Sequence, residues 1–200
     1  MAKHFILYIS LFLFRSLAVA QRHSNKQIPP EVRQPVLQAL AYFPELDHYS
    51  IEFKFRKKLK NRVMQAQPKI KTLLKHKSKR HYKITMSRNL VMKDTVLSIT
   101  SLSDKVLVGW FAHELGHVMD YKDRSSGNMV KFALKYLTSK PFLRSSELRA
   151  DALAADNGCA HHLIETKNYI LFESRFTTAY KSKIKELYPS PDDISAMQAE

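Results

Sequence analysis

Hydrophobic and polar residues alternate through the first half of the chain with the period of two that is typical of β-strands. This pattern predicts four strands, over residues 50–55, 62–67, 82–87 and 95–100. A helix is expected before them over residues 31–43, with Pro35 in its first turn, where the missing N–H does little harm. A short helix over 70–74 and a basic loop over 75–80 are expected between the second and third strands.

The period changes to that of a helix at Asp104. Helical spacing continues to Tyr121, with Ser103 or Asp104 as the N-cap. Further helices are predicted over residues 128–137, 145–157 (ended by Gly158) and 165–187 (ended by Pro189). Because strands come first and helices after, and no repeat or linker divides the chain, we expect one α+β domain over residues 21–200, a small mixed sheet followed by a helical C-terminal half.

The first twenty residues have the pattern of an export signal. A basic start is followed by an apolar run from Phe5 to Phe14, which is closed by Arg15, and then by the small-residue pattern of residues 18–20. The apolar run is about half as long as a membrane-spanning helix. We therefore expect cleavage before Gln21 and a secreted or periplasmic protein without a membrane span, tethered to the membrane if the segment stays uncleaved. The other alternative is a short buried helix.

The composition narrows the chemistry. A hydrophobic content of 44% with 26% charged residues is typical of a globular protein. No glycine-rich phosphate-binding motif is present. The single cysteine, Cys159, excludes an internal disulfide framework and a thiolate metal site, so any metal must be bound by His, Asp or Glu.

The positive charge of the protein is concentrated in one segment. The formal net charge is +15, and residues 54–93 contain fifteen Lys and Arg but no Asp or Glu. Such a segment can bind an anionic polymer or surface, or steer an acidic substrate. Because many of its basic residues alternate with apolar ones, we favour a solvated face of the sheet, and we expect no nucleic-acid partner.

Residues 113–117, His-Glu-Leu-Gly-His, form an HExxH motif inside the helix predicted from Asp104. Positions i and i+4 share a helix face, so His113 and His117 can bind one zinc ion, while Glu114 borders the metal and can act as general base. The flanking residues are apolar nearly all round the helix, which predicts that it is buried. Two histidines and a carboxylate there need partners, and a metal ion satisfies all three.

A catalytic zinc requires a third protein ligand, for which the sequence offers two candidates. Glu147 shares a helix face with Asp151, which can accept the second N–H of one ligand histidine. Asp123 follows His113 by ten residues, but that arrangement usually has a glycine at the position of Asp120. We therefore favour Glu147 as the ligand, with Asp151 in support.

With these two motifs, HExxH at 113–117 and ExxxD at 147–151, the segment 95–160 resembles the gluzincin metallopeptidases, specifically the HtpX-like group. The resemblance implies a zincin-like fold, a zinc endopeptidase that uses Glu114 as general base and acid, and a strand, expected here over 95–100, that pairs with the substrate backbone. The chain differs from the best-known members in lacking transmembrane helices and in the short spacing of 30 residues between His117 and Glu147.

The donor that would stabilise the oxyanion stays open between four residues, His161, His162, Arg175 and Tyr180. The adjacent histidines are more typical of a helix end, and Tyr121 of the core. The alternative function is a non-catalytic, extracytoplasmic anion-binding protein with a structural or vestigial zinc site.

Overall fold

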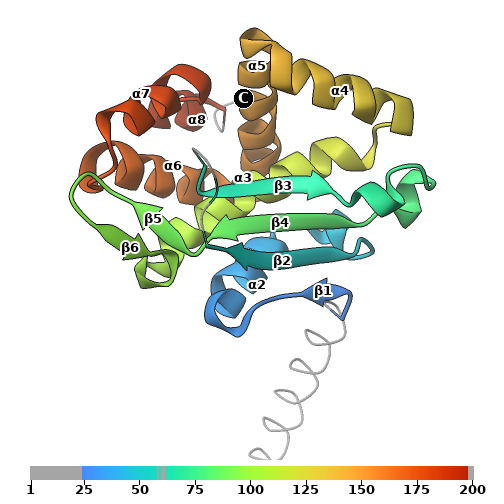
Figure 1. Ribbon diagram of the computed structural model, residues 1–200, viewed down its shortest axis with the longest axis horizontal. Helices are drawn as coiled ribbons and strands as arrows, with labels where there is room; N and C mark the ends of the chain where they lie inside the picture. The colour runs from blue at the N-terminus through green and yellow to red at the C-terminus, as the bar shows by residue number, and fades with distance from the viewer. Residues whose placement is uncertain (1–23, 58, 60–61, 198–200) are drawn as a thin grey trace, which may run out of the picture.

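The computed structural model describes residues 24–57, 59 and 62–197; the expected signal segment lies outside them. A four-stranded mixed sheet comes first and helices follow (Figure 1), which confirms the α+β class. The sheet consists of β1 (Lys26–Gln27), β2 (Ile51–Arg56), β3 (Met64–Pro68) and β4 (Tyr82–Ser87), in the order β1-β2-β4-β3.

Strand β3 is the antiparallel edge of this sheet. Strand β2 runs parallel to β1 and β4, whereas β3 pairs antiparallel with β4, with Ala66 opposite Ile84. One side of β3 therefore has no neighbouring strand within the described sheet. The sequence predicted β2, β3 and β4 to within two residues at each end, because alternation and Pro68 mark them.

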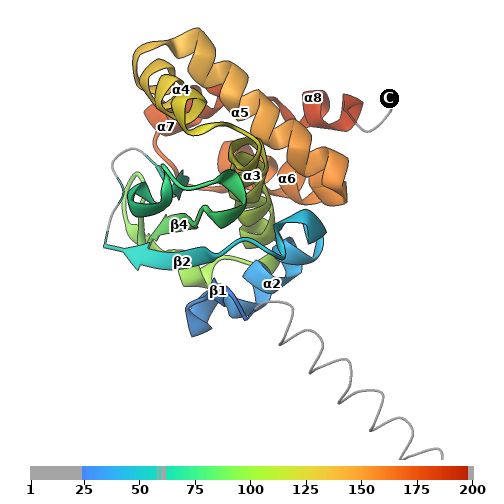
Figure 2. The same ribbon diagram turned by 90° about the vertical axis from the view of Figure 1, so that its right-hand side faces the viewer.

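Seven α-helices are described: α2 (Arg33–Ala41), α3 (Asp104–Lys122), α4 (Ser126–Thr138), α5 (Lys140–Ala154), α6 (Ala160–Asn168), α7 (Thr178–Leu187) and α8 (Pro191–Ala196). In Figure 2, where the sheet is seen toward its edge, α2 and α3 lie on one side of it. Helix α3 is buried from Val106 to Tyr121, as predicted from the apolar residues on nearly all of its sides. The rings of Phe53 on β2 and Phe111 on α3 meet edge to face, with centroids 5.9 Å apart.

Helix α3 lies unusually close to two other helices. A Cβ at Gly109 would overlap the carbonyl oxygen of His162 on α6, and a Cβ at Gly116 would overlap that of Ala150 on α5. Each glycine therefore permits a backbone approach that a side chain would prevent. Gly116, inside the HExxH motif, is the point at which α5 reaches the motif.

Two expectations were wrong in detail. The strand predicted over 95–100 is β6 (Val96–Ser98) followed by a 3₁₀ turn (Ile99–Ser101), and it forms a separate hairpin with β5 (Asn89–Val91). The helix predicted over 165–187 is two helices, α6 and α7, because the Ser174 hydroxyl bonds the Ile170 carbonyl and Thr177 caps a new helix by accepting from the Tyr180 N–H. Local side-chain hydrogen bonds of this kind can end a helix even where the apolar sequence pattern continues.

Other element boundaries follow from local geometry. Gly158, with φ of 87°, ends the α5 region as predicted, because this left-handed conformation favours glycine. The helix expected over 31–43 is α2 with a 3₁₀ turn before it (Pro30–Val32), and the segments expected as a short helix and a loop contain 3₁₀ turns (Ile70–Thr72 and Lys77–Lys79). No helix of the described residues is long and apolar enough to cross a membrane.

Candidate metal centre

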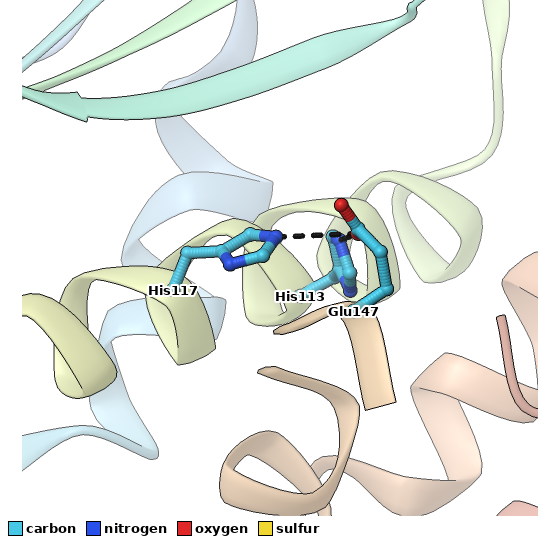
Figure 3. A group of neighbouring side chains, drawn as sticks. All are labelled: His113, His117 and Glu147. Atoms are coloured by element: carbon cyan, nitrogen blue, oxygen red, sulfur yellow. Dashed lines mark hydrogen bonds and ion pairs between the residues drawn. The ribbon is translucent and has the colours of Figure 1, made fainter. Parts of the chain in front are cut away.

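Three buried side chains from two helices meet at one point (Figure 3). His113 and His117 extend from the same face of α3, and Glu147 reaches them from α5. Oε2 of Glu147 lies 3.1 Å from Nε2 of His113 and 3.3 Å from Nε2 of His117. The ligand atoms of the three residues all lie within 4.8 Å of one another.

This spacing suits a shared metal ion. Two donors bound at about 2.0–2.1 Å to one tetrahedral ion are about 3.3 Å apart, so the carboxylate oxygen is already at a ligand's distance from both imidazoles. Two imidazole nitrogens and one carboxylate oxygen are a donor set that divalent transition metals accept. The group can therefore hold a metal ion. Asp123, the other candidate for third ligand, is exposed at the end of α3, ion-paired with Lys122, and is not part of this group.

The contact between α3 and α5 explains how Glu147 reaches the histidines. Gly116 packs against the backbone of Ala150, so the two helices are close enough for a carboxylate one turn earlier on α5 to extend over α3. The Ser139 hydroxyl caps α5 by accepting the Phe142 N–H, and Pro141 lies in its first turn. These local signals set where α5 begins, earlier than the sequence pattern indicated.

Asp151 forms a hydrogen bond with one of the two histidines. Its Oδ1 lies 2.7 Å from Nδ1 of His113, which directs the other ring nitrogen, Nε2, toward Glu147. On its other side Asp151 accepts a hydrogen bond from Nζ of Lys167, at 2.9 Å. His113, Asp151 and Lys167 thus form a buried chain from three helices. By contrast, Nδ1 of His117 is buried without a hydrogen-bond partner among the described residues.

Aromatic residues surround the three side chains of this group. Tyr136 on α4 donates a hydrogen bond of 2.5 Å to Oε1 of Glu147, which leaves Oε2 for the histidines. The ring of Tyr121 stacks on that of His117, with centroids 5.8 Å apart, and is buried as the sequence indicated. Tyr188, which follows α7, lies with its ring 5.5 Å from that of His113.

Glu114 is buried beside the two histidines and faces the sheet. Its Oε2 accepts a hydrogen bond of 2.5 Å from the backbone N–H of Ala66 on the edge strand β3. Burial raises the pKa of Glu114, while the neighbouring histidines oppose that shift. A carboxyl group with a raised pKa is suited to accept and release a proton near neutral pH.

Opposite charges within the group shift the pKa values of His113 and Glu147. Burial alone would lower the pKa of His113, but the carboxylates of Asp151 and Glu147 raise it to about 10. Burial would likewise raise the pKa of Glu147, but the two imidazoles hold it well below its usual range. His113 and Glu147 therefore form an ion pair, and a metal ion held by Nε2 of His113 would replace the proton there.

The three donors open onto a cleft between β3 and α4. The cleft has a volume of about 340 Å³, and His113, Glu114 and His117 lie in its wall. Most of the remaining wall is apolar, from the side chains of Met64, Ile70, Leu73, Met129, Val130, Phe132 and Leu137. A smaller cavity, whose wall also contains Tyr188, likewise reaches His113 and Glu114.

Of the four candidate oxyanion donors, the structure brings only Tyr180 near the metal group. Tyr180 lines the smaller cavity beside His113 and Glu114. His161 and His162 lie on α6 against the ring of Tyr42, and Arg175 is exposed and pairs with Asp94.

Sequence reasoning missed Tyr136, Lys167 and Tyr188. A buried lysine on an amphipathic helix carries no local signal, because its partner, Asp151, is sixteen residues away. For Tyr136, the only sequence signal was its place on an apolar face of the predicted helix, which equally fits a core residue.

Comparison of the chain with protein-family models, with curated proteins and with solved structures gave no match.

Proposed function

We propose that this protein is a zinc-dependent endopeptidase of the gluzincin type, similar to the HtpX-like group and with a zincin-like fold. The observation that carries the proposal is the convergence of His113, His117 and Glu147, with the carboxylate of Glu114 beside them in an open cleft. A purely structural metal site has no need of an additional buried carboxylate facing a cavity.

Zinc is the metal that we propose for this donor set. Two histidines and one glutamate are three protein ligands, the number found in catalytic zinc sites, whereas structural sites are closed by four. When bound, zinc would act as a Lewis acid that polarises a peptide carbonyl and lowers the pKa of water toward about 7. Asp151, backed by Lys167, keeps Nε2 of His113 available as the ligand atom.

Glu114 is the proposed general base and acid. It accepts a proton from the attacking water, whose oxygen bonds to the carbonyl carbon, and delivers the proton to the nitrogen of the breaking C–N bond. The N–H of Ala66 bonds one oxygen of its carboxylate, which fixes the orientation of the group.

Strand β3 is the proposed binding edge for the substrate backbone. The resemblance to gluzincins led us to expect residues 95–100 in this role, but β6 is paired with β5 in a separate hairpin, whereas β3 lines the cleft with Met64, Ala66 and Pro68. A peptide in extended conformation can add to an unpaired strand edge through main-chain hydrogen bonds. The apolar wall from α4 would then receive an apolar substrate side chain.

Two tyrosines are candidates to stabilise the oxyanion. Tyr188 lines both cavities at the metal group and Tyr180 lines the smaller one. Burial raises the pKa of both phenols well above the usual value, and nearby carboxylates add to the shift. Both therefore remain protonated donors at neutral pH, as this role requires.

The alternative function is an anion-binding protein in which the metal is structural or vestigial. The cationic segment 54–93 favours it, since all of the excess positive charge lies there. Loss of cleavage in Glu114→Gln with the metal retained would separate the two, because a structural site has no use for a general base.

We also propose that residues 1–20 are an export signal, so that the protein acts outside the cytoplasm. The support is the basic start, the short apolar run and the small-residue pattern before Gln21. N-terminal sequencing of the protein recovered from its source tests this, and a mature chain that still begins at Met1 contradicts it.

The test of the proposed activity is metal analysis together with chelator-sensitive cleavage of casein or a peptide library. We expect one zinc per chain in the wild type, and in Glu114→Gln the same zinc content with activity lower by about 10²–10⁴-fold. His117→Ala should lose the metal, while Glu165→Gln, on the exposed face of α6, should change neither. Wild-type protein that carries no zinc after dialysis against trace zinc, or a Glu114→Gln variant that cleaves as well as the wild type, would refute the proposal.

A further inference from the structure

Large apolar side chains are exposed at the mouth of the cleft on two separate elements. Ile70 and Leu74, in the turn between β3 and β4, are 84% and 86% exposed. Val130, Leu134 and Leu137 on α4 are 57%, 65% and 78% exposed. We refer to these five residues as the cleft rim.

The cleft rim continues the apolar wall of the cleft and extends beyond it. Ile70, Val130 and Leu137 line the cleft, whereas Leu74 and Leu134 lie outside it. The Ser126 hydroxyl at the start of α4 donates to the carbonyl of Leu73, which ties the two elements together. Both views show α4 beside the β3–β4 connection (Figures 1 and 2). A peptide held in the cleft would leave Leu74 and Leu134 uncovered.

The apolar surface of helix α4 is about twice as wide as that of an ordinary surface helix packed on one side. Met129, Phe132 and Tyr136 form one stripe that faces the protein interior. Val130, Leu134 and Leu137 follow positions i, i+4 and i+7 and form a second stripe that faces outward. At about 100° per residue the two stripes together span roughly 200°, against an apolar stripe of about 100° on an ordinary surface helix.

Lysines are interleaved with the cleft rim. Lys71 and Lys75 flank Ile70 and Leu74, Lys77 and Lys79 follow them, and Lys131 lies beside the outer stripe of α4; all five are exposed. None of the five forms an ion pair with a carboxylate of the described residues. Exposed apolar side chains bordered by unpaired lysines are the pattern of a surface that lies in the interface of an anionic bilayer.

We infer that the cleft rim docks on an anionic lipid membrane, with Ile70, Leu74, Leu134 and Leu137 inserted among the headgroups and acyl chains and the lysines paired with lipid phosphates or carboxylates. The mouth of the metal-site cleft would then face the bilayer surface. This inference goes beyond the proposed hydrolysis and does not rest on it.

The charge of the surface argues against a second copy of the chain as the occupant. A symmetric dimer through the cleft rim would bring the same patch of each copy together, and therefore lysine against lysine. An anionic bilayer, by contrast, matches both the apolar residues and the charge.

The test places an environment-sensitive fluorophore (NBD) on single cysteines in the full-length protein. Leu74→Cys and Leu134→Cys report on the cleft rim, and Phe172→Cys, equally an exposed apolar residue but after α6, is the matched control. Native Cys159 is buried and should not take the label. Because each label reports only its own position, binding through another part of the chain cannot imitate insertion of the rim.

With vesicles of phosphatidylcholine and phosphatidylserine, we expect the emission at positions 74 and 134 to rise and shift to the blue and that at 172 to stay unchanged. Phosphatidylcholine vesicles alone should give a much weaker response. Lys71→Gln with Lys75→Gln should weaken binding to the anionic vesicles by roughly fivefold per lysine, and Lys93→Gln with Lys185→Gln, away from the rim, should not.

The inference is overturned if labels at 74 and 134 stay in water with anionic vesicles, or if position 172 responds equally. It is also overturned if the rim labels shift with protein concentration in the absence of lipid, which would indicate a second copy. A response to heparin but not to vesicles would identify an anionic polymer instead. Zinc content and cleavage play no part in this readout, so this inference and the proposed hydrolysis can fail independently.

Discussion

Nζ of Lys167 lies 2.9 Å from Oδ2 of Asp151, and the other oxygen of the same carboxylate is 2.7 Å from the ring of His113. All three side chains are buried. Burial would raise the pKa of Asp151, but Lys167 and His113 hold it below its usual value. Lys167 therefore keeps Asp151 ionised, and Asp151 in turn orients His113, whose Nε2 faces Glu147.

Replacement of Lys167 by methionine should weaken metal binding without removing a ligand. Loss of its charge leaves Asp151 with one partner instead of two, and changes behind a ligand histidine typically cost about 10–100-fold in metal affinity. Zinc titration against a competing chelator measures the effect. Lys185→Met, on the exposed face of α7, is the matched control; equal affinity of both variants would show that Lys167 does not act on the metal site.

Tyr136→Phe should also lower metal affinity, by a smaller factor. The phenol donates to Oε1 of Glu147, and its loss leaves that oxygen without this donor and free to compete with Oε2. We expect a drop of roughly tenfold in zinc affinity, since one hydrogen bond to a charged group contributes about 1.5 kcal/mol or more. Tyr42→Phe, a tyrosine packed against His161 and His162, should leave the affinity unchanged. A Tyr136→Phe variant that binds zinc as tightly as the wild type would contradict this role.

Gly116→Ala should separate α5 from α3. The new methyl group would occupy the position of the Ala150 carbonyl, so the helices must move apart and Glu147 would leave the histidines. We expect both thermal stability and zinc affinity to fall, measured by calorimetric unfolding with and without zinc. Gly127→Ala, where a Cβ meets nothing within 4 Å, should retain the zinc affinity of the wild type. If Gly116→Ala binds zinc normally, close helix approach is not what positions Glu147.

The thiol of Cys159 should be protected in the folded protein. Burial raises its pKa from 9.0 to about 12, so the reactive thiolate is scarce and inaccessible at neutral pH. Alkylation with N-ethylmaleimide should be slow in the native state and fast in denaturant. Fast native labelling would contradict its burial.

The same shift has a consequence for stability. Because the folded state holds the proton more tightly, this contribution to stability is fully present below pH 9 and is lost as pH rises toward 12. Cys159→Ala should show a smaller alkaline decline in urea midpoint than the wild type. Equal declines would place the alkaline sensitivity in other groups.

Much of the fold follows from local pattern. Alternation marks β2 and β4, the change of period marks the start of α3, and Gly158 marks a helix end. Prediction from the sequence failed where side-chain hydrogen bonds ended a helix within an apolar pattern, as between α6 and α7. The strand expected over 95–100 as a partner for the substrate backbone pairs instead with its neighbour β5 in a separate hairpin, since only the tertiary structure assigns a strand to a sheet.

The sequence by itself determined that two imidazoles and a carboxylate share one helical segment, because a spacing of four residues has a fixed meaning on an α-helix. It also indicated Glu147 and Asp151 as a pair on a second helix. Only the tertiary structure decided that Gly116 lets this second helix close over the first, that Lys167 bonds Asp151 and Tyr136 bonds Glu147, and that β3 borders Glu114. These contacts join residues that are distant in the chain, and helical or strand periodicity carries no information about such distances.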